Sequence, residues 1–363
     1  MTASAWRKAL ATTTLAVTLA AAAPAVAQQQ QQQPAMPEVT WPPPADAPPR
    51  KVEIIKVQDW RTRARDMVET LSEYVRARAP NATLLMRGGA SLLFRTEKDQ
   101  ELADLAAPPG VAANRPEPEP IGTLQRQFAR AIDGVVVDGL SCGFTPELSA
   151  DQVKRLHGFG VKVLTIEACP TDEAAKAARE SAAKLGVLAH VGGADSLGQI
   201  PGGRLAGANP QMVQALGEAK TILFNLDNRA YASKGDWLRA LSETNHDVLV
   251  IEPFFRGDKA LTPQEVYALK FKKVGTPRLV LARLPMTTAY DTAWYWKATW
   301  KVGNPSFIKD VGERPGAFVV DYTNTEWRSL VGQTFSGLMD LGFDGIMLDG
   351  MDAVARMDDE AVN

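Results

Sequence analysis

The sequence predicts an α/β protein, and within that class a single (β/α)8 barrel of the TIM type. Eight short runs rich in β-branched residues and Leu predict strands at 82–86, 134–140, 161–168, 186–191, 221–226, 247–252, 278–284 and 345–349. Several runs, such as 135–137, are apolar without alternation, as expected for parallel strands that are buried on both faces. Helical patterns separate the runs, and this regular alternation favours a closed barrel over an open doubly wound sheet.

The first 50 residues predict an export signal followed by a linker. Residues 1–27 begin with a basic pair, continue as an apolar run and end on Ala25-Val26-Ala27, a pattern that signal peptidase accepts. Residues 28–50 are rich in Gln and Pro and predict a flexible or polyproline-like tether. We therefore expect a periplasmic or secreted protein with no stable membrane anchor after cleavage, and a barrel domain over 51–363.

Helix signals fall between the predicted strands. The segment 60–79 places its apolar side chains on one face and predicts a packed helix. Ser149 with Gln152, and Thr262 with Glu265, have the spacing of capping boxes, in which a side chain and a backbone N–H satisfy each other at a helix start. These boxes predict helices that follow the second and sixth strands.

Composition excludes several classes of function. The chain has 40 basic and 42 acidic residues, and this near-neutral balance argues against a nucleic-acid partner. With 3 His and 2 Cys, a Cys/His zinc cluster is excluded. No strand is followed by the glycine spacing of a nucleotide-binding loop. We therefore expect neither a cofactor nor a metal, and a hard cation bound by carboxylates ranks second.

The two cysteines follow neighbouring predicted strands by a few residues. Cys142 and Cys169 should therefore lie in adjacent loops, and an exported protein meets oxidising conditions. The residues leave two alternatives open, a disulfide between Cys142 and Cys169 or two inert buried thiols.

Acidic residues gather where the predicted strands end, which is the functional end of this type of barrel. They are Asp138, Glu167, Asp227, Glu252, Asp349 and Asp352. Any one of them alone is more simply explained as a helix cap or a loop acceptor. Together, converging carboxylates shift one another's pKa values, as the acid and its partner in a glycosidase require.

Aromatic residues follow the seventh predicted strand in a stretch rich in Gly, Pro and Asn. They are Tyr290, Trp294, Tyr295, Trp296, Trp300, Phe318, Tyr322 and Trp327. Much of this area must serve packing, but the stretch also predicts a long ordered loop over the barrel mouth. We expect at least one ring, Trp296 or Tyr322 among them, to contact a sugar face.

The C-terminal half resembles a known family. Tyr295-Trp296-Lys297, Trp300 and Gly303-Asn304-Pro305 are followed by the closing segments Phe343-Asp344-Gly345 and Leu348-Asp349-Gly350. In combination these segments resemble glycoside hydrolase family 114, a family of TIM barrels that includes endo-α-1,4-polygalactosaminidases. The resemblance implies a barrel that hydrolyses a polysaccharide, one that contains amino sugars.

The order of the resembling segments is changed. Segments at 72–75, 84–89, 132–134 and 163–167 resemble the latter half of the family, whereas its early strands correspond to residues after 219. This order implies a circular permutation in which the chain opens after the family's fourth strand. A closed barrel tolerates such a change because every strand pairing remains available. The region near Trp60 should then lie beside the region near Asp352.

The resemblance also implies a catalytic pair. By position the pair is Asp349, as nucleophile or charge stabiliser, and Asp138, as proton donor where the family has Glu. Glu252 and Glu167 would position substrate groups, together with Asp227.

Three positions besides Asp138 depart from the family pattern. Thr288 replaces an acidic residue, Glu252 stands where the family has Asp, and Arg87 begins a turn that is Gln-Asn-Gly in the family. We still expect Arg87 and Thr288 among the substrate-binding residues of the barrel mouth, where these changes bear on both the substrate and the activity.

Three functions remain open. The first is an exported glycoside hydrolase acting on a polysaccharide or oligosaccharide by two carboxylates. The second is a catalytically degenerate saccharide-binding or scaffold protein on the same barrel, which Arg87 and Thr288 favour. The third is a barrel enzyme with a small anionic substrate, suggested by Arg87, Arg256 and Arg283 near strand ends.

Overall fold

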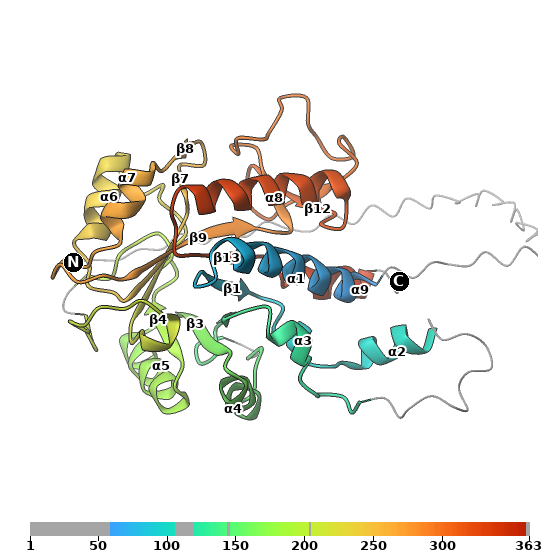
Figure 1. The fold of residues 1–363 in the computed structure, drawn as a ribbon, viewed down its shortest axis with the longest axis horizontal. Helices are drawn as coiled ribbons and strands as arrows, with labels where there is room; N and C mark the ends of the chain where they lie inside the picture. Colours follow the sequence, from blue (N-terminus) through green and yellow to red (C-terminus); the bar gives the residue numbers. More distant parts are fainter. Residues whose placement is uncertain (1–58, 106–118, 144–145, 203–204, 361–363) are drawn as a thin grey trace, which may run out of the picture. The chain divides into compact units, whose positions relative to one another are not determined.

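A computed structural model describes residues 59–105, 119–143, 146–202 and 205–360 (Figure 1). The predicted signal at 1–27 and linker at 28–50 lie outside the described residues, so both stay predictions. Within the described ranges, no helix combines the length and apolar character that a membrane crossing needs.

Eight parallel strands form the main sheet, and they confirm the predicted (β/α)8 class. Each lies within about two residues of its predicted range. They are β1 (Thr83–Arg87), β2 (Gly134–Asp138), β3 (Lys162–Ala168), β4 (Leu188–Gly192), β5 (Ile222–Asn225), β6 (Val248–Ile251), β9 (Leu279–Pro285) and β13 (Gly345–Asp349). The hydrogen-bonded order is β4-β3-β2-β1-β13-β9-β6-β5. Apart from β4 and β5, which are not paired with each other, each strand thus pairs with the barrel strands before and after it in the chain, and the first strand, β1, pairs with the last, β13, as in a (β/α)8 barrel.

Helices pack around the outside of this sheet, except for α2, which has no buried residue and extends away from it (Figure 1). They are α1 (Trp60–Arg78), α2 (Glu97–Leu105), α3 (Arg126–Ala129), α4 (Ala150–Phe159), α5 (Asp172–Leu185), α6 (Lys234–Ser242), α7 (Pro263–Leu269), α8 (Thr325–Asp340) and α9 (Ala353–Glu360). The predicted capping boxes are confirmed at the starts of α4 and α7.

The barrel is closed everywhere except between β4 and β5. These two strands lie against each other but share no ladder of hydrogen bonds. In its described residues, the connection between them has only a short 3-10 helix, Leu216–Glu218, where the other connections carry an α-helix. The weak seam and the missing helix therefore coincide.

Two small antiparallel sheets are added at the ends of the barrel strands. β7 (Phe254–Phe255) pairs with β8 (Lys259–Ala260) after β6. β10 (Thr288–Tyr290), β12 (Ala317–Val320) and β11 (Ile308–Val311) form a three-stranded sheet between β9 and α8. The aromatic stretch expected as a long loop is thus partly a sheet.

The N-terminal helix α1 packs against the C-terminal helix α9 (Figure 1). Its buried face includes Ala64, Val68 and Leu71, and these side chains belong to the same hydrophobic core as Leu84 of β1 and Ile346 of β13. Trp60, at the start of α1, packs against Tyr322. The two ends of the described barrel therefore meet, as the expected permutation requires.

The barrel interior is apolar with a few buried polar groups. His190 and His246 are almost completely buried, and burial lowers the pKa of each to about 4. At the opposite end from the mouth, the buried Lys272 and Asp247 pair at 2.5 Å.

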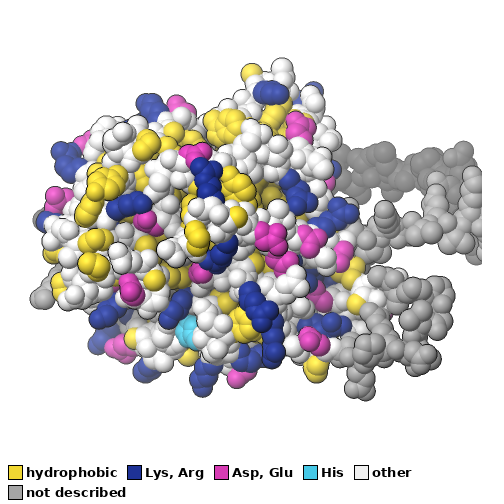
Figure 2. Space-filling model, in the orientation of Figure 1, with side chains coloured by type: hydrophobic (Ala, Val, Ile, Leu, Met, Phe, Trp, Pro, Cys, Tyr) yellow, Lys and Arg dark blue, Asp and Glu magenta, His cyan; other side chains and the backbone are white. Residues whose placement is uncertain are grey.

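On the face shown in Figure 2, basic and acidic side chains are interspersed.

Candidate functional site

The mouth of the barrel lies at the C-terminal ends of its strands. Arg87 ends β1, Asp138 ends β2 and Asp349 ends β13. Because β1 pairs with both β2 and β13, Arg87 stands between the two aspartates. Two acids far apart in sequence therefore belong to one site.

Arg87 joins these aspartates directly. Its Nε and Nη2 donate to the Asp138 carboxylate at 3.1 and 2.5 Å, and its Nη1 donates to Asp349 Oδ1 at 3.2 Å. The next residue, Gly88, has φ +74°, and a side chain there would collide with the backbone of Asp352. The glycine turn thus brings the end of β1 close to the loop after β13.

Arg283, in β9, extends the network on the other side of Asp349. Its Nε donates to Asp349 Oδ2, its Nη1 donates to Glu252 Oε2 at 3.1 Å, and its Nη2 donates to the hydroxyl of Tyr290 at 2.9 Å. Three carboxylates and two guanidinium groups therefore alternate across the mouth.

The surroundings push two of these carboxyl pKa values apart. Burial alone would raise the pKa of Asp349, but the adjacent Arg283 and Arg87 outweigh it and lower the pKa below its usual value. Burial raises the pKa of Glu252, although Arg283 opposes the increase. Asp349 is therefore held ionised, whereas Glu252 takes up a proton more readily.

The two aspartates differ strongly in their access to solvent. The side chain of Asp138 is 51% exposed, but that of Asp349 is only 7% exposed, behind Arg87 and Arg283. Neither aspartate lines the cavities of the mouth. A substrate could reach Asp349 only after Arg87 or Arg283 moved.

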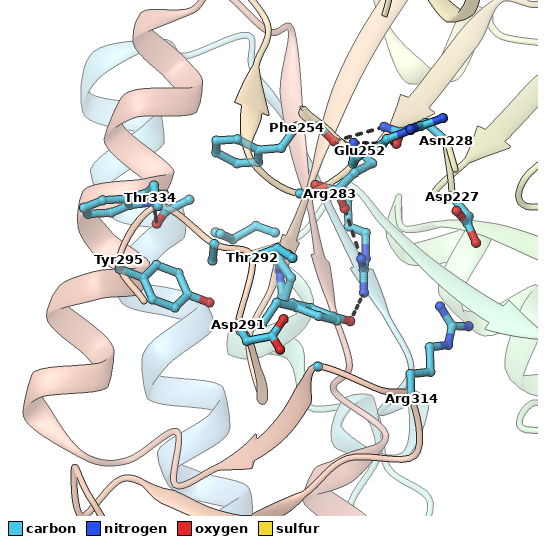
Figure 3. A pocket seen from close by; sticks show the side chains of 18 of the residues that line it. Asp227, Asn228, Glu252, Phe254, Arg283, Asp291, Thr292, Tyr295, Arg314 and Thr334 are labelled. Carbon is cyan, nitrogen blue, oxygen red and sulfur yellow. Dashed lines mark hydrogen bonds and ion pairs between the residues drawn. The ribbon is translucent and has the colours of Figure 1, made fainter. Parts of the chain in front are cut away.

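Two adjoining cavities open beside this network. The smaller, of about 270 Å³, is walled by Phe254, Tyr290, Trp294 and Tyr295, and Glu252 and Arg283 form its floor (Figure 3). The larger, a cleft of about 770 Å³, continues from it toward Arg87. Residues shared by both are Asp227, Arg229, Arg283, Tyr290, Arg314 and Pro315.

Asp227 is the expected strand-end acid that lines both cavities. Arg229 donates to both of its carboxylate oxygens, at 2.9 and 2.5 Å, and these bonds lower the pKa of Asp227. Asp227 is thus an anion with a fixed partner.

Glu167 lies outside the cavities. It is completely buried and accepts hydrogen bonds from the backbone N–H of Ser141 and Cys142 and from the hydroxyl of Thr165. Its role is to hold the loop after β2, which corrects the expectation that it positions substrate.

Cys142 and Cys169 form a disulfide in the structure, with Cα atoms 5.2 Å apart. This bond ties the same loop to the end of β3. Glu167 lies close enough to both sulfurs to complete a metal-binding group. The two sulfurs are already bonded to each other, and the Glu167 carboxylate already accepts hydrogen bonds from three donors.

Three other residues expected to contact the substrate also lie away from the cavity walls. Trp296 stacks on Phe318, with ring centroids 4.6 Å apart. Tyr322 is 1% exposed and donates its hydroxyl to the carbonyl of Trp60. Thr288 pairs with Val319 in the small sheet. The rings that do face the smaller cavity are Tyr290, Trp294 and Tyr295.

Sequence reasoning missed several mouth residues. Asp291 and Arg314 line the smaller cavity from the loops around the added sheet, where no strand-end pattern marks them. Arg229 also lines the cavity, and its position two residues after the strand-end acid Asp227 is the one signal in the sequence that could have indicated it.

Comparisons with known proteins give limited information. No family profile matches the chain. It is 30% identical over 122 residues to an uncharacterised protein of Deinococcus radiodurans, covering 33% of this chain and 38% of that protein. Uncharacterised proteins of Thermotoga maritima and Methanocaldococcus jannaschii are 26% and 25% identical, over 34% of this chain and 38% and 35% of theirs. The matched part thus spans less than two fifths of each relative.

Among solved structures, the spore cortex-lytic enzyme SleL of Bacillus cereus is similar at a TM-score of 0.32 and 12% identity. The alignment covers 77% of this chain and 74% of that one.

Proposed function

We propose that this protein is an exported barrel of the glycoside hydrolase family 114 type that acts on a polysaccharide through carboxylates at its mouth. The observation that carries the proposal is the convergence of Asp138, Asp349 and Glu252 on one arginine-linked network beside an aromatic-walled cavity. A glycosidase needs one ionised and one protonated carboxyl group next to a place for a sugar ring.

The pKa shifts favour a change in the expected roles. Asp349 suits the ionised partner, the nucleophile or charge stabiliser, because two guanidinium groups keep its pKa low. Glu252 suits the proton donor better than Asp138, because burial raises its pKa and it borders the cavity. Asp138 is half exposed, is bound by Arg87 and lines neither cavity.

A second candidate is saccharide binding without hydrolysis. It is favoured by Arg87, which bonds both aspartates and covers Asp349. In this case the network shapes the binding surface and no carboxylate meets the glycosidic bond.

A cleavage assay separates these candidates. The purified protein is incubated with partially N-acetylated galactosamine polymer, neutral galactan and polygalacturonate, and new reducing ends are measured. A hydrolase releases reducing ends, and Asp349→Asn and Glu252→Gln each lower the rate by about 100-fold or more. Asp236→Asn, on the outer helix α6, serves as the matched control and keeps the wild-type rate.

Saturable binding without new reducing ends supports the second candidate. The absence of both binding and cleavage with all three polymers contradicts the proposal.

We also propose the circular permutation. It is supported by the contact between α1 and α9 and by the hydrophobic core that α1 shares with β1 and β13. Alignments limited to about a third of the chain are compatible with it, because an alignment that keeps chain order can follow only one side of a permuted joint.

Export is proposed from residues 1–27. Mass spectrometry of the protein recovered from the periplasm or medium should give a mature chain that begins at Gln28. A chain that keeps Met1 and stays inside the cell would contradict export.

A further inference from the structure

The wider cleft is lined by more cations than anions. Four arginines line it, against two acidic residues, Asp195 and Asp227. The arginines are Arg87, Arg229, Arg283 and Arg314. The surface that a ligand meets in the cleft therefore carries an excess of positive charge.

The carboxylates that neutralise two of these arginines do not line the cleft. Asp349, which pairs with both Arg87 and Arg283, is buried behind them, and Asp138 bonds Arg87 from the side of β2. The pairs are thus oriented with their cationic partners toward the cleft. An anionic ligand in the cleft is therefore closer to the arginines than to their aspartate partners, so the attraction outweighs the repulsion.

Arg314 differs from the other three arginines. It lies in the exposed turn between β11 and β12 and extends toward the side of the cavity where Asp227 lies (Figure 3). In the part of the chain that the structure describes, its guanidinium group has no hydrogen bond and no ion pair. Its charge contributes to the low pKa of Asp227 from a distance. It is therefore free to bind a ligand.

The smaller cavity supplies a place for a ring next to this charge. Tyr290, Trp294 and Tyr295 offer aromatic surface, and the exposed carboxylate of Asp291 faces the same space (Figure 3). A volume of about 270 Å³ is at the low end for ligand sites, so it suits one sugar ring rather than a chain. Asp291 can accept hydrogen bonds from ring hydroxyl groups while a substituent on the ring reaches Arg314.

We infer that the barrel mouth binds an acidic saccharide, whose sugars carry carboxylates, instead of the amino-sugar chain that the family resemblance implies. The inference rests on the proposed function, because it names the substrate class of the same site. A uronate carboxylate takes both N–H groups of an arginine fork, which suits Arg314. The ammonium groups of an amino-sugar chain would instead meet four arginines of like charge, against only two acidic residues, Asp195 and Asp227.

The test is a binding titration with three matched probes: trimers of galacturonic acid, galactose and galactosamine. The wild-type protein should bind the galacturonic acid trimer about tenfold more tightly than the galactose trimer, and the galactosamine trimer most weakly. Arg314→Gln should weaken binding of the acidic trimer about tenfold and leave the galactose trimer unchanged. Arg314→Lys, which keeps the charge but loses the fork, should give an intermediate value.

Arg239→Gln is the matched control, because it removes the same charge from the outer helix α6. Binding of the galactosamine trimer more tightly than the acidic trimer overturns the inference, as does an unchanged Kd for the acidic trimer in Arg314→Gln. In both cases the saccharide still binds, so the proposed function stands. Binding of none of the three trimers contradicts both.

Discussion

At the scale of single residues, each carboxylate of the central network at the barrel mouth is bonded to at least one arginine, and two arginines keep the pKa of Asp349 low. The sequence predicted the acids, because their positions after strands are visible in the chain. It could not predict which acids are paired, since the ion pairs of Asp349 join three different strands. Glu167 shows the same limit, because its position matches the other strand ends but its side chain turns inward to bind backbone N–H groups.

Substituting Arg87 tests the ion-pair network. Arg87→Gln removes a partner from the buried Asp349, so its pKa should rise and the free energy of unfolding should fall by about 2 kcal/mol near neutral pH. The lowered pKa of Asp349 stabilises the fold above the ordinary carboxyl pKa, and that stability is lost as the pH falls through the folded-state value. The variant should therefore lose less stability on acidification than the wild type.

Urea unfolding at several pH values measures this difference. The control Arg229→Gln removes an exposed pair with Asp227 and should cost less than about 1 kcal/mol. Equal losses in the two variants would show that Arg87 has no special role.

The two buried histidines predict a separate loss of stability in acid. His190 has a pKa of about 4 in the folded protein against an ordinary value of 6.5, so the unfolded chain binds more protons between these values. The free energy of unfolding should fall as the pH drops from 6.5 to 4, by at most about 3 kcal/mol for this residue. Unfolding curves of the wild type and His190→Gln should diverge in slope over this range. Parallel pH dependences would refute the assignment.

At the scale of elements, strands and helix caps were predictable because their signals are local. The capping boxes of α4 and α7 need only four consecutive residues, and the barrel strands are continuous apolar runs. The sheet of β10, β11 and β12 was not predicted, since β11 (Ile308–Val311) is short and partly charged and pairs only through its tertiary neighbours. The cavity that this sheet helps to enclose could not be predicted either, because its walls depend on the same tertiary pairing of strands.

The disulfide should stabilise the loop between β2 and α4. Cys142 and Cys169 are separated by 27 residues, and closing a loop of this length is worth about 3 to 4 kcal/mol in the chain-entropy description. The double variant Cys142→Ser, Cys169→Ser should lose that amount in urea unfolding. A reducing agent should lower the stability of the wild type to the same level and leave the variant unchanged. A wild type that is indifferent to reduction would contradict this role.

At the scale of the whole molecule, the barrel has a continuous sheet from β4 round to β5 and a seam between those two strands. The order of strands followed from the alternation of strands and helices in the sequence. The seam did not, because the absence of one helix from the connection before β5 looks like an ordinary long loop in the chain.

The seam predicts where the barrel opens most easily. Peptides from β4 (Leu188–Gly192) and β5 (Ile222–Asn225) should exchange amide hydrogens faster than peptides from β1 and β13, which have strand partners on both sides. Hydrogen exchange followed by mass spectrometry measures this, with β13 as the internal reference. Uniform protection around the barrel would mean that the seam is as stable as the paired strands.

The central claim is that the mouth of this barrel is a saccharide site. The most direct measurement is a titration of ¹⁵N-labelled protein with the galacturonic acid trimer, followed through the indole N–H signals of its tryptophans. Trp294 borders the smaller cavity, whereas Trp237 is a buried residue of α6 whose indole N–H is bonded to Asn225. The signal of Trp294 should shift in a saturable way while that of Trp237 stays fixed. A fixed Trp294 signal, or shifts confined to tryptophans outside the mouth, would contradict the claim.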